Sequence, residues 1–307
     1  MPGVVVSTMT ETVLVTGGLG RSGRWLVDGL ADDYEVVCLD TAHPGFEVAE
    51  RESISFRACD LTDRGETFET VAEVDPDAVV HWAALPSPER HAGGHVFETN
   101  TMATYNTLVA AGRADARVVW ASSESAYGFA FRRTDALPDR LPITEEHAMR
   151  PEDPYGTSKV VGEEIAKMVV RRYDTPVVSI RPSWIQYPGE YNCRSALAEE
   201  GLSVGAGNFW SYVDVRDVVS LVASALGSGV RGHEAVHAAA ADTYLDRGTV
   251  DAVRDYFGAV PEDCEVTGTD SPLSTAKADR LFDWTPSHSW RDAVDEDVPE
   301  PALLAEE

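Results

Sequence analysis

Short apolar segments and amphipathic helical segments alternate along the first part of this chain. Six apolar segments are predicted to be strands: 12–16, 34–40, 53–60, 78–84, 116–122 and 176–182. Helical patterns lie between them at 21–31, 65–74, 98–114 and 157–173. Nearly continuous apolar runs suit strands that are buried on both faces of a parallel sheet. The regular alternation therefore predicts an α/β fold with right-handed crossovers and a Rossmann-like, doubly wound parallel sheet.

A glycine triplet follows the first predicted strand, in the segment TGGLGRSG. Gly17, Gly20 and Gly23 stand between that strand and a helical segment, where the backbone must turn sharply and approach an anion without a Cβ. The helix that begins near Arg21 offers free N–H groups to such an anion. A glycine triplet in this context predicts a pyrophosphate site, and hence a bound dinucleotide.

An acidic residue ends the second predicted strand. Asp40 follows Gly23 by seventeen residues, and its carboxylate can accept hydrogen bonds from both ribose hydroxyls of an adenosine. A carboxylate at this place would repel a 2′-phosphate, so Asp40 favours NAD. Arg21 and Arg24 lie nearby in the sequence and could hold a phosphate, so NADP stays open as an alternative.

A tyrosine and a lysine stand four residues apart in the last of these helical segments, so that they share one helix face. A tyrosine, with a pKa of about 10, is a poor base at neutral pH. The ammonium of Lys159 and the positive ring of a bound nicotinamide are both expected to favour the phenolate of Tyr155 and to lower its pKa. Ser122, Ser123 and Ser125 follow a buried strand, where one hydroxyl could hold a substrate oxygen. Together these groups predict removal of a proton from a substrate alcohol.

Lysine is rare in this chain, which holds three lysines among its 25 basic residues. A compact ammonium can bond a nicotinamide ribose and still lie beneath a phenol oxygen, which the planar fork of arginine does less well. This difference explains why Lys159 remains a lysine.

The chain carries 52 acidic against 25 basic residues, a formal charge of −27. Such a surface repels nucleic acid and anionic membranes. At about 1 M salt the Debye length is about 3 Å, so the self-repulsion of dispersed acids is screened. The composition therefore indicates adaptation to a salty cytoplasm. Four separated cysteines, Cys38, Cys59, Cys193 and Cys264, are predicted to be free thiols. No leader or membrane-spanning segment is expected, so the protein is predicted to be cytoplasmic.

Two histidine pairs have the i, i+4 spacing that can hold a metal. They are His91 with His95 and His233 with His237. Two glycines interrupt the first pair as a helix, and the second pair lies in a predicted strand with no third ligand in view. No metal site is predicted.

Motifs in order from residue 12 to residue 286 resemble the extended short-chain dehydrogenase/reductase family, also called NAD-dependent epimerase/dehydratases. They are TGGLGRSG, Asp60-Leu61, HWAA at 81–84, Asn100, SSESAYG, YGTSK, RPS at 181–183, YVDVRDV and STAKADRLFDWTP. The resemblance implies that Ser123, four residues before Tyr127, acts with Tyr155 and Lys159 in catalysis. It implies that NAD or NADP contacts Gly17, Gly20, Arg21, Ser22, Gly23, Asp40, Asp60, Leu61, Ala83, Ala84, Asn100, Tyr155, Lys159, Pro182 and Ser183. It also implies a homodimer or homotetramer.

The pattern divides the chain into two domains. Residues 11–182 are predicted to bind the dinucleotide, and residues 183–298 to form mainly a small C-terminal substrate-binding domain. Segment 213–240 is expected to return to the first domain. Residues 1–10 and 299–307 are expected to be flexible ends, because acid and proline leave little to bury.

Two sequence differences from other groups of this family bear on which substrate the chain would use. Dehydratases carry an acidic pair after the active hydroxyl, whereas this chain has Glu124 and Ser125, which disfavours dehydration. Sugar-nucleotide enzymes carry a long insertion, whereas segment 184–212 is short and holds one arginine, although a diphosphate needs several donors. Aromatic faces and amide tips suit a neutral sugar. The predicted substrate contacts are Ser123, Glu124, Ser125, Trp184, Asn192, Arg194 and Trp210.

The short segment and the acidic composition resemble the free-aldose and uronate dehydrogenases of this family, most closely the haloarchaeal L-arabinose 1-dehydrogenases. The resemblance implies oxidation of the anomeric hydroxyl of a free sugar, such as a pentose or a uronate, to a lactone with NAD or NADP. Two alternatives remain: 4-epimerisation of a UDP-sugar with NAD kept bound, and a dinucleotide-sensing scaffold without chemistry.

Overall fold

The computed structural model describes residues 10–44, 51–87 and 90–303 of the 307-residue chain. Within these residues seven parallel strands form one sheet in the order β10–β7–β5–β4–β1–β2–β3. They are β1 (Thr12–Thr16), β2 (Glu35–Asp40), β3 (Ile54–Ala58), β4 (Ala78–His81), β5 (Arg117–Ala121), β7 (Val177–Pro182) and β10 (His233–Ala238). The strand order reverses between β1 and β4, where a parallel sheet leaves a ligand crevice at its carboxyl edge. The predicted doubly wound α/β fold is confirmed.

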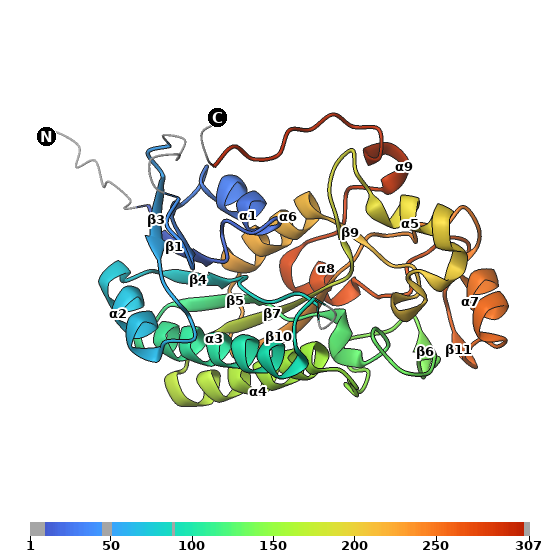
Figure 1. Ribbon diagram of the computed structural model, residues 1–307, viewed down its shortest axis with the longest axis horizontal. Helices are drawn as coiled ribbons and strands as arrows, with labels where there is room; N and C mark the ends of the chain where they lie inside the picture. The colour runs from blue at the N-terminus through green and yellow to red at the C-terminus, as the bar shows by residue number, and fades with distance from the viewer. Residues whose placement is uncertain (1–9, 45–50, 88–89, 304–307) are drawn as a thin grey trace, which may run out of the picture.

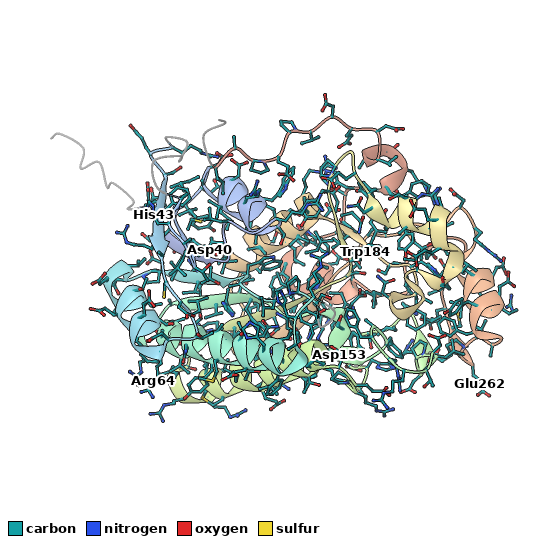
Figure 2. The ribbon with its side chains drawn as sticks, viewed as in Figure 1. Asp40, His43, Arg64, Asp153, Trp184 and Glu262 are labelled. Carbon is teal, nitrogen blue, oxygen red and sulfur yellow. The ribbon has the colours of Figure 1, made fainter. Side chains whose placement is uncertain are left out.

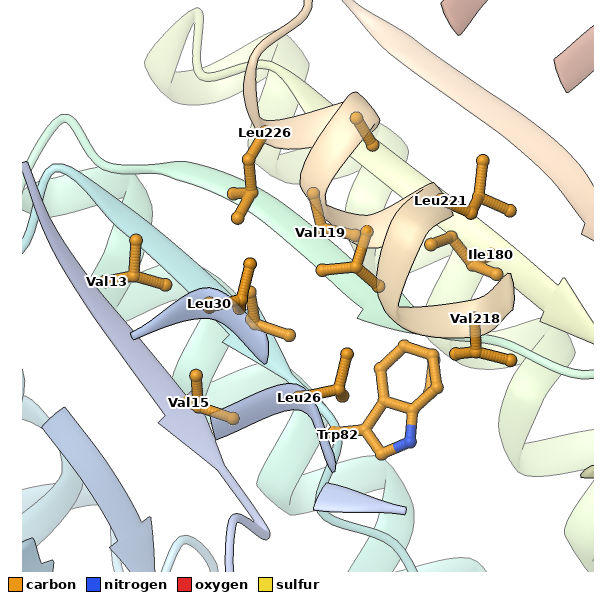
Figure 3. Packing of buried hydrophobic residues seen from close by; sticks show 14 of the residues in the cluster. Val13, Val15, Leu26, Leu30, Trp82, Val119, Ile180, Val218, Leu221 and Leu226 are labelled. Atoms are coloured by element: carbon orange, nitrogen blue, oxygen red, sulfur yellow. The ribbon is translucent and has the colours of Figure 1, made fainter. Parts of the chain in front are cut away.

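Helices cover both faces of this sheet (Figure 1). One face carries α2 (Arg64–Val74), α3 (Gly93–Arg113) and α4 (Pro154–Tyr173). The other face carries α1 (Gly23–Leu30), α6 (Val215–Leu226) and α8 (Ala276–Phe282). Figure 3 shows how Leu26 and Leu30 of α1 and Leu221 of α6 pack against strand residues such as Val15 and Val119. Alternate residues of each strand serve the two faces, which is why these strands are apolar throughout.

A smaller lobe lies beyond the carboxyl edge of the sheet (Figure 1, right). Its described elements are β6 (Arg140–Leu141), β8 (Ile185–Gln186), α5 (Asn192–Glu200), β9 (Val213–Asp214), α7 (Thr249–Phe257), β11 (Asp263–Cys264) and α9 (Trp290–Ala293), with the 3-10 helices η1 (Glu124–Tyr127), η2 (Gly201–Ser203) and η3 (Ala206–Asn208). Aromatic side chains dominate its core, among them Tyr191, Trp210, Tyr212 and Tyr244. Strand β6 pairs with β11, and β8 pairs with β9.

The chain crosses between the two lobes more often than its sequence indicates. Segment 213–240 places α6 and β10 in the first domain, as expected. Two further crossings differ from the predicted boundaries. Strand β6 lies within 11–182 but pairs with β11, and α8 lies within 183–298 but buries Ala278 and Phe282 in the core of the first domain. These boundaries depend on long-range pairing, which local sequence patterns do not record.

The C-terminal segment returns from α9 across the molecule to α1 (Figure 1). Glu300 pairs with Arg24 at 3.2 Å, and Leu303 is buried in the core shared by α1 and α6. The prediction of a flexible end is therefore wrong for 299–303, because one leucine and one ion pair anchor an otherwise acidic, proline-containing segment. Residues 1–9 and 304–307, the remaining parts of the predicted flexible ends, lie outside the described residues.

In the part of the chain that the structure describes, no helix has the length and apolar character needed to span a membrane. All four cysteines are free, and three of them are buried. Burial raises the pKa of the Cys38 thiol to about 12.

Candidate active site

A cleft of about 510 Å³ runs along the carboxyl ends of the central strands. All the predicted cofactor contacts except Ser183 line it: Gly17, Gly20, Arg21, Ser22, Gly23, Asp40, Asp60, Leu61, Ala83, Ala84, Asn100, Tyr155, Lys159 and Pro182. The lining also contains Thr41, Thr62 and Ile185, which were not predicted from the sequence, and Ser122, which was predicted as a candidate for holding a substrate oxygen. Thr41 and Thr62 directly follow the predicted contacts Asp40 and Leu61, so sequence proximity to those residues could have identified them.

The glycine turn after β1 has the form that a phosphate cradle requires. Gly17 has φ +69°, and a Cβ there would lie 2.7 Å from the Cα of Ala83. A Cβ on Gly23 would overlap the carbonyl oxygen of Gly17. The loop thus keeps its backbone open toward the cleft, with the start of α1 behind it. These residues fit a bound dinucleotide pyrophosphate.

The end of β2 presents a carboxylate to the cleft. Asp40, labelled in Figure 2, accepts hydrogen bonds from the N–H of Leu19 at 3.0 Å and from that of Thr41 at 2.8 Å. A carboxylate has about four acceptor positions, so capacity remains for ribose hydroxyls. Two backbone donors also fix its orientation, which suits recognition of an adenosine ribose.

Both arginines that could hold a 2′-phosphate are engaged by acidic side chains. Arg21 pairs with Glu190 and stacks over the ring of Tyr187 at 3.9 Å. Arg24 donates to Glu300 at 3.2 Å. A phosphate would have to compete with these carboxylates for the same guanidinium groups.

Helix α4 brings the predicted catalytic residues to the middle of the cleft. Its N-cap is Asp153, labelled in Figure 2, whose carboxylate accepts from the N–H of Gly156 at 2.8 Å. This cap fixes the first turn, which carries Tyr155. One turn later the ammonium of Lys159 donates to the carbonyl oxygen of Ala121 at 2.8 Å and lies 5.4 Å from the centre of the Tyr155 ring.

Ser123, which follows β5, completes this group. It caps η1, and its hydroxyl accepts from the N–H of Ser125 at 3.0 Å and hydrogen-bonds with Tyr155. Ser123, Tyr155 and Lys159 are therefore brought together, although they come from two separate parts of the sequence.

The electrostatics of this group differ from the expectation. Burial raises the pKa of Tyr155 to about 12, although the hydrogen bond with Ser123 acts to lower it. Burial likewise lowers the pKa of Lys159 to about 7. The predicted lowering of the phenol pKa relied on Lys159 and a nicotinamide ring together; in the protein groups by themselves burial outweighs the effect of Lys159, because the packing that brings the two side chains together also penalises both charges. A phenolate here needs a further positive charge in the cleft.

Glu124, a partly buried glutamate, directly follows Ser123. Burial raises the pKa of Glu124 to about 8, while the neighbouring side chains of Ser183 and Asn208 act to lower it. Glu124 is therefore mostly protonated at neutral pH and can donate a hydrogen bond as well as accept one. Ser183, which does not line the cofactor cleft, belongs to this neighbouring polar group.

The predicted substrate residues of the smaller lobe take different positions. Trp210 is fully buried in the lobe core, where its indole N–H donates to the carbonyl oxygen of Leu202 at 3.0 Å, so the prediction for Trp210 is wrong. Trp184, labelled in Figure 2, is half-buried and meets the Tyr244 ring edge-to-face at 6.1 Å. Asn192 begins α5 and is exposed. An aromatic pattern alone does not separate a core tryptophan from one near a site.

Arg194, the single arginine of 184–212, is held within the smaller lobe. It donates to Asp246 at 2.6 Å and to the carbonyl oxygen of Tyr244 at 2.6 Å, and it stacks over the Trp290 ring at 3.8 Å. Its charge is balanced and its side chain supports the fold, which does not favour its predicted role in substrate binding.

Asn100 connects α3 to the cleft. Its amide exchanges two hydrogen bonds with the backbone of Leu85, at 2.8 and 3.1 Å, and a third reaches the hydroxyl of Ser158 at 3.4 Å. These hydrogen bonds anchor α3 to the segment that follows β4 and to α4.

The histidine pairs make ordinary hydrogen bonds. His233 bonds the hydroxyl of Ser179 at 2.8 Å, and His237 bonds that of Tyr127 at 2.5 Å. Among the described residues no group of three or more His, Cys, Asp or Glu side chains is placed to hold a metal ion.

The family model for the NAD dependent epimerase/dehydratase family matches residues 13–238. The chain belongs to this family. The match runs from β1 to the end of β10. It therefore contains the glycine turn, the group of Ser123, Tyr155 and Lys159, and the segment with α6 and β10 that returns to the first domain.

Relatives within the family differ in the activities that their names state. A putative UDP-glucose 4-epimerase of Methanocaldococcus jannaschii is 32% identical over 176 residues, which cover 56% of this chain and 55% of that protein. The L-arabinose 1-dehydrogenase (NAD(P)(+)) of Haloferax volcanii is 32% identical over 179 residues, covering 56% of this chain and 66% of that protein. A crystal structure of a UDP-galactose 4-epimerase superposes with a TM-score of 0.66 at 26% identity and covers 95% of this chain and 97% of its own. The sequence matches thus span only about half to two thirds of these curated relatives.

Proposed function

We propose that this chain oxidises the anomeric hydroxyl of a neutral free sugar, such as a pentose like L-arabinose, to a lactone with NAD. The observation that carries the proposal is the character of the groups beside Ser123. Glu124, mostly neutral at physiological pH, lies near the Ser183 hydroxyl, which is buried without a hydrogen-bond partner, and near the amide of Asn208. The arginine of segment 184–212 is balanced by Asp246. Hydrogen-bonding groups without a spare cation suit sugar hydroxyls better than a diphosphate.

The proposed chemistry follows from the positions of three side chains. The hydroxyls of Ser123 and Tyr155 bond the anomeric oxygen, and Tyr155 accepts its proton. Bound NAD supplies the acceptor for the hydride that leaves C1 and a positive ring that favours the phenolate. Lys159 lies within reach to hold a ribose hydroxyl while bonded to Ala121, which fixes its ammonium beneath the phenol. The C1–H and O–H bonds break and a lactone carbonyl forms.

NAD is the preferred coenzyme in this proposal. Asp40 presents its carboxylate where a 2′-phosphate would lie, and Arg21 and Arg24 are already paired with Glu190 and Glu300. The relative from Haloferax volcanii carries both coenzymes in its name, so both need testing.

The test is an assay in high salt, which suits a chain with a formal charge of −27. The purified full chain is mixed with NAD or NADP and a panel of aldoses and uronates, and absorbance is followed at the wavelength of the reduced coenzyme. Tyr155→Phe should abolish the signal, whereas Tyr105→Phe, a matched change at an exposed tyrosine of α3, should keep it. Silence across the panel with both coenzymes would refute the proposal.

A second candidate, 4-epimerisation of a UDP-sugar, is supported by the relative from Methanocaldococcus jannaschii. It predicts interconversion of UDP-glucose and UDP-galactose with no net reduced coenzyme, which nucleotide-sugar chromatography separates from the first reaction. A scaffold without chemistry would give neither product, and Tyr155→Phe would leave its dinucleotide affinity unchanged.

We also propose a homodimer built on α3. Phe97, Met102 and Tyr105, three exposed large apolar side chains, all lie on this helix. A second copy would cover them, since an exposed apolar helix face in an acidic, high-salt protein favours self-association.

A further inference from the structure

A second cavity, of about 430 Å³, lies apart from the cofactor cleft, against α4, β7, β10 and α8. Its lining gathers five cationic side chains from four elements, together with three glutamates: Arg140, Lys167, Arg181, Lys277 and Arg280, with Glu145, Glu146 and Glu163. Acidic residues outnumber basic residues in the whole chain by 52 to 25, so a cavity lined by more basic than acidic side chains differs from the overall composition. The cavity is therefore an unusual electrostatic environment for this molecule.

Two of the three lysines of the chain line this cavity. Lys167 comes from α4 and Lys277 from α8, so they meet through the fold and not through sequence proximity. Since nearly every other basic position is an arginine, a lysine marks a place where a compact, strongly hydrated point charge is required. The remaining lysine, Lys159, lies in the catalytic group.

His233 lines the same cavity, and the neighbouring charges affect its pKa. Burial lowers its pKa to about 4; the carboxylate of Glu163 acts to raise it, and Lys167, Arg181 and Lys277 each act to lower it further. Three cations and one carboxylate thus face this imidazole. The local excess of positive charge supports an anion-binding role, which rests first on the geometry of the cavity.

The carboxylates around the cavity pair with its inner and rim cations: Glu163 with Arg181, and Asp263 and Glu265 with Arg140, each at 3.6 Å from Arg140. Glu163 is buried and accepts two hydrogen bonds from Arg181, both of 2.7 Å, and one from Ser122 of 2.7 Å. Glu145 accepts from the N–H of His237 at 3.0 Å. Glu146 is exposed to solvent. The buried acids are thus already committed to protein partners.

The outer cations have weak or no partners. Lys167 pairs with Glu164 at 2.7 Å and Lys277 with Glu234 at 2.9 Å, in partly exposed contacts of the kind that contribute little. Arg280 is exposed and has no ion pair with another described residue. Two ammonium groups and one guanidinium are thus able to turn toward a ligand.

We propose that this cavity binds a phosphate group, held by Lys167, Lys277 and Arg280. A phosphate dianion offers three acceptor oxygens and about two negative charges, so it can accept from all three side chains and balances more of their charge than a single carboxylate or chloride. The same chemistry is offered by inorganic phosphate and by the phosphate monoester of a metabolite. The proposal does not depend on the sugar reaction proposed above.

The test uses isothermal titration of the full chain with inorganic phosphate and, in a second arm, with glucose 6-phosphate. We expect saturable binding that weakens at least about tenfold in Lys277→Gln/Arg280→Gln, since two charge-assisted hydrogen bonds are lost. Arg280→Lys, which keeps the charge at this exposed position, should retain binding. A tighter complex with the ester would identify the metabolite source, and equal affinities would identify free phosphate.

Two controls separate this cavity from the cofactor cleft. Arg254→Gln removes an exposed arginine of α7 and should leave the titration unchanged. Arg21→Gln alters the cleft and should also leave it unchanged. Phosphate binding that disappears with Arg21→Gln but survives Lys277→Gln/Arg280→Gln would place the anion in the cleft and overturn the proposal. No saturable heat in either arm would overturn it as well.

Discussion

Replacement of Glu124 by glutamine tests the electrostatics of the site most directly. Burial raises the pKa of this carboxyl from 4.5 to about 8 in the folded protein. Below the unfolded pKa both states are protonated, so the side chain costs nothing. As pH rises, the unfolded state releases its proton first, and the folded state loses stability until the folded pKa is passed. A permanently neutral glutamine removes this penalty.

The size of the effect follows from the shift. At about pH 7, which is about 2.5 units above the unfolded pKa of 4.5, keeping Glu124 protonated in the folded protein lowers the free energy of unfolding by about 3 kcal/mol. Above about pH 8 the penalty levels off at about 5 kcal/mol. Glu124→Gln keeps an amide that can bond Ser183 and Asn208, so it should unfold at a higher temperature than the wild type at neutral pH. The advantage should vanish near pH 4.5.

Thermal unfolding in constant high salt across this pH range measures the difference. Glu146→Gln, a matched change at an exposed glutamate, should show no pH-dependent gain. Activity gives a second readout, because an ionised Glu124 would lose the hydrogen bond that it donates to a sugar hydroxyl. The ratio of kcat/KM between variant and wild type should rise about tenfold per pH unit above the wild-type pKa. A stability difference that is flat with pH, or that favours the wild type at high pH, would refute the reasoning.

Three further predictions concern other parts of the molecule. Glu163→Gln leaves Arg181 buried without its carboxylate and should cost about 3–5 kcal/mol in chemical unfolding; since the pKa of Glu163 is lowered in the folded protein, this loss should shrink as pH falls through that pKa. Asp40→Asn should weaken NAD binding about tenfold and reduce the preference for NAD over NADP. Initial rates at varied concentrations of each coenzyme give both quantities, as the KM for NAD and the ratio of kcat/KM between NAD and NADP. Met102→Glu/Tyr105→Glu should convert the proposed dimer to a monomer in light scattering, whereas an unchanged mass would exclude α3 as the interface.

The nucleotide-binding half was predictable because its determinants are local. A strand, a glycine turn and a helix follow each other within twenty residues, so the sequence itself records the cradle around Gly17 and Gly23. Asp40 is fixed in the same way, as the last residue of a strand whose neighbour in the sheet is β1. In a parallel sheet every strand delivers its end to one edge, and local spacing then suffices to assemble a cleft.

The smaller lobe was less predictable because its residues are placed by contacts between distant segments. Trp184 and Trp210 come from the same short segment and have the same chemistry, yet one is half-buried and the other belongs to the core. Arg194 is decided by Asp246, fifty-two residues further along the chain. No local pattern distinguishes these outcomes, since each depends on which partner the fold supplies.

The ionisation of the catalytic group shows the same limit in energetic terms. The i, i+4 spacing correctly places Lys159 beside Tyr155, but proximity is only one contribution to a pKa. The other is loss of water, and it grows with the packing that creates the proximity. In this chain burial dominates, moving the phenol and the ammonium pKa values to about 12 and about 7. In the proposed reaction, proton removal by Tyr155 therefore depends on the charge of what binds in the cleft, and we expect the phenol to become an effective base only when the coenzyme is bound.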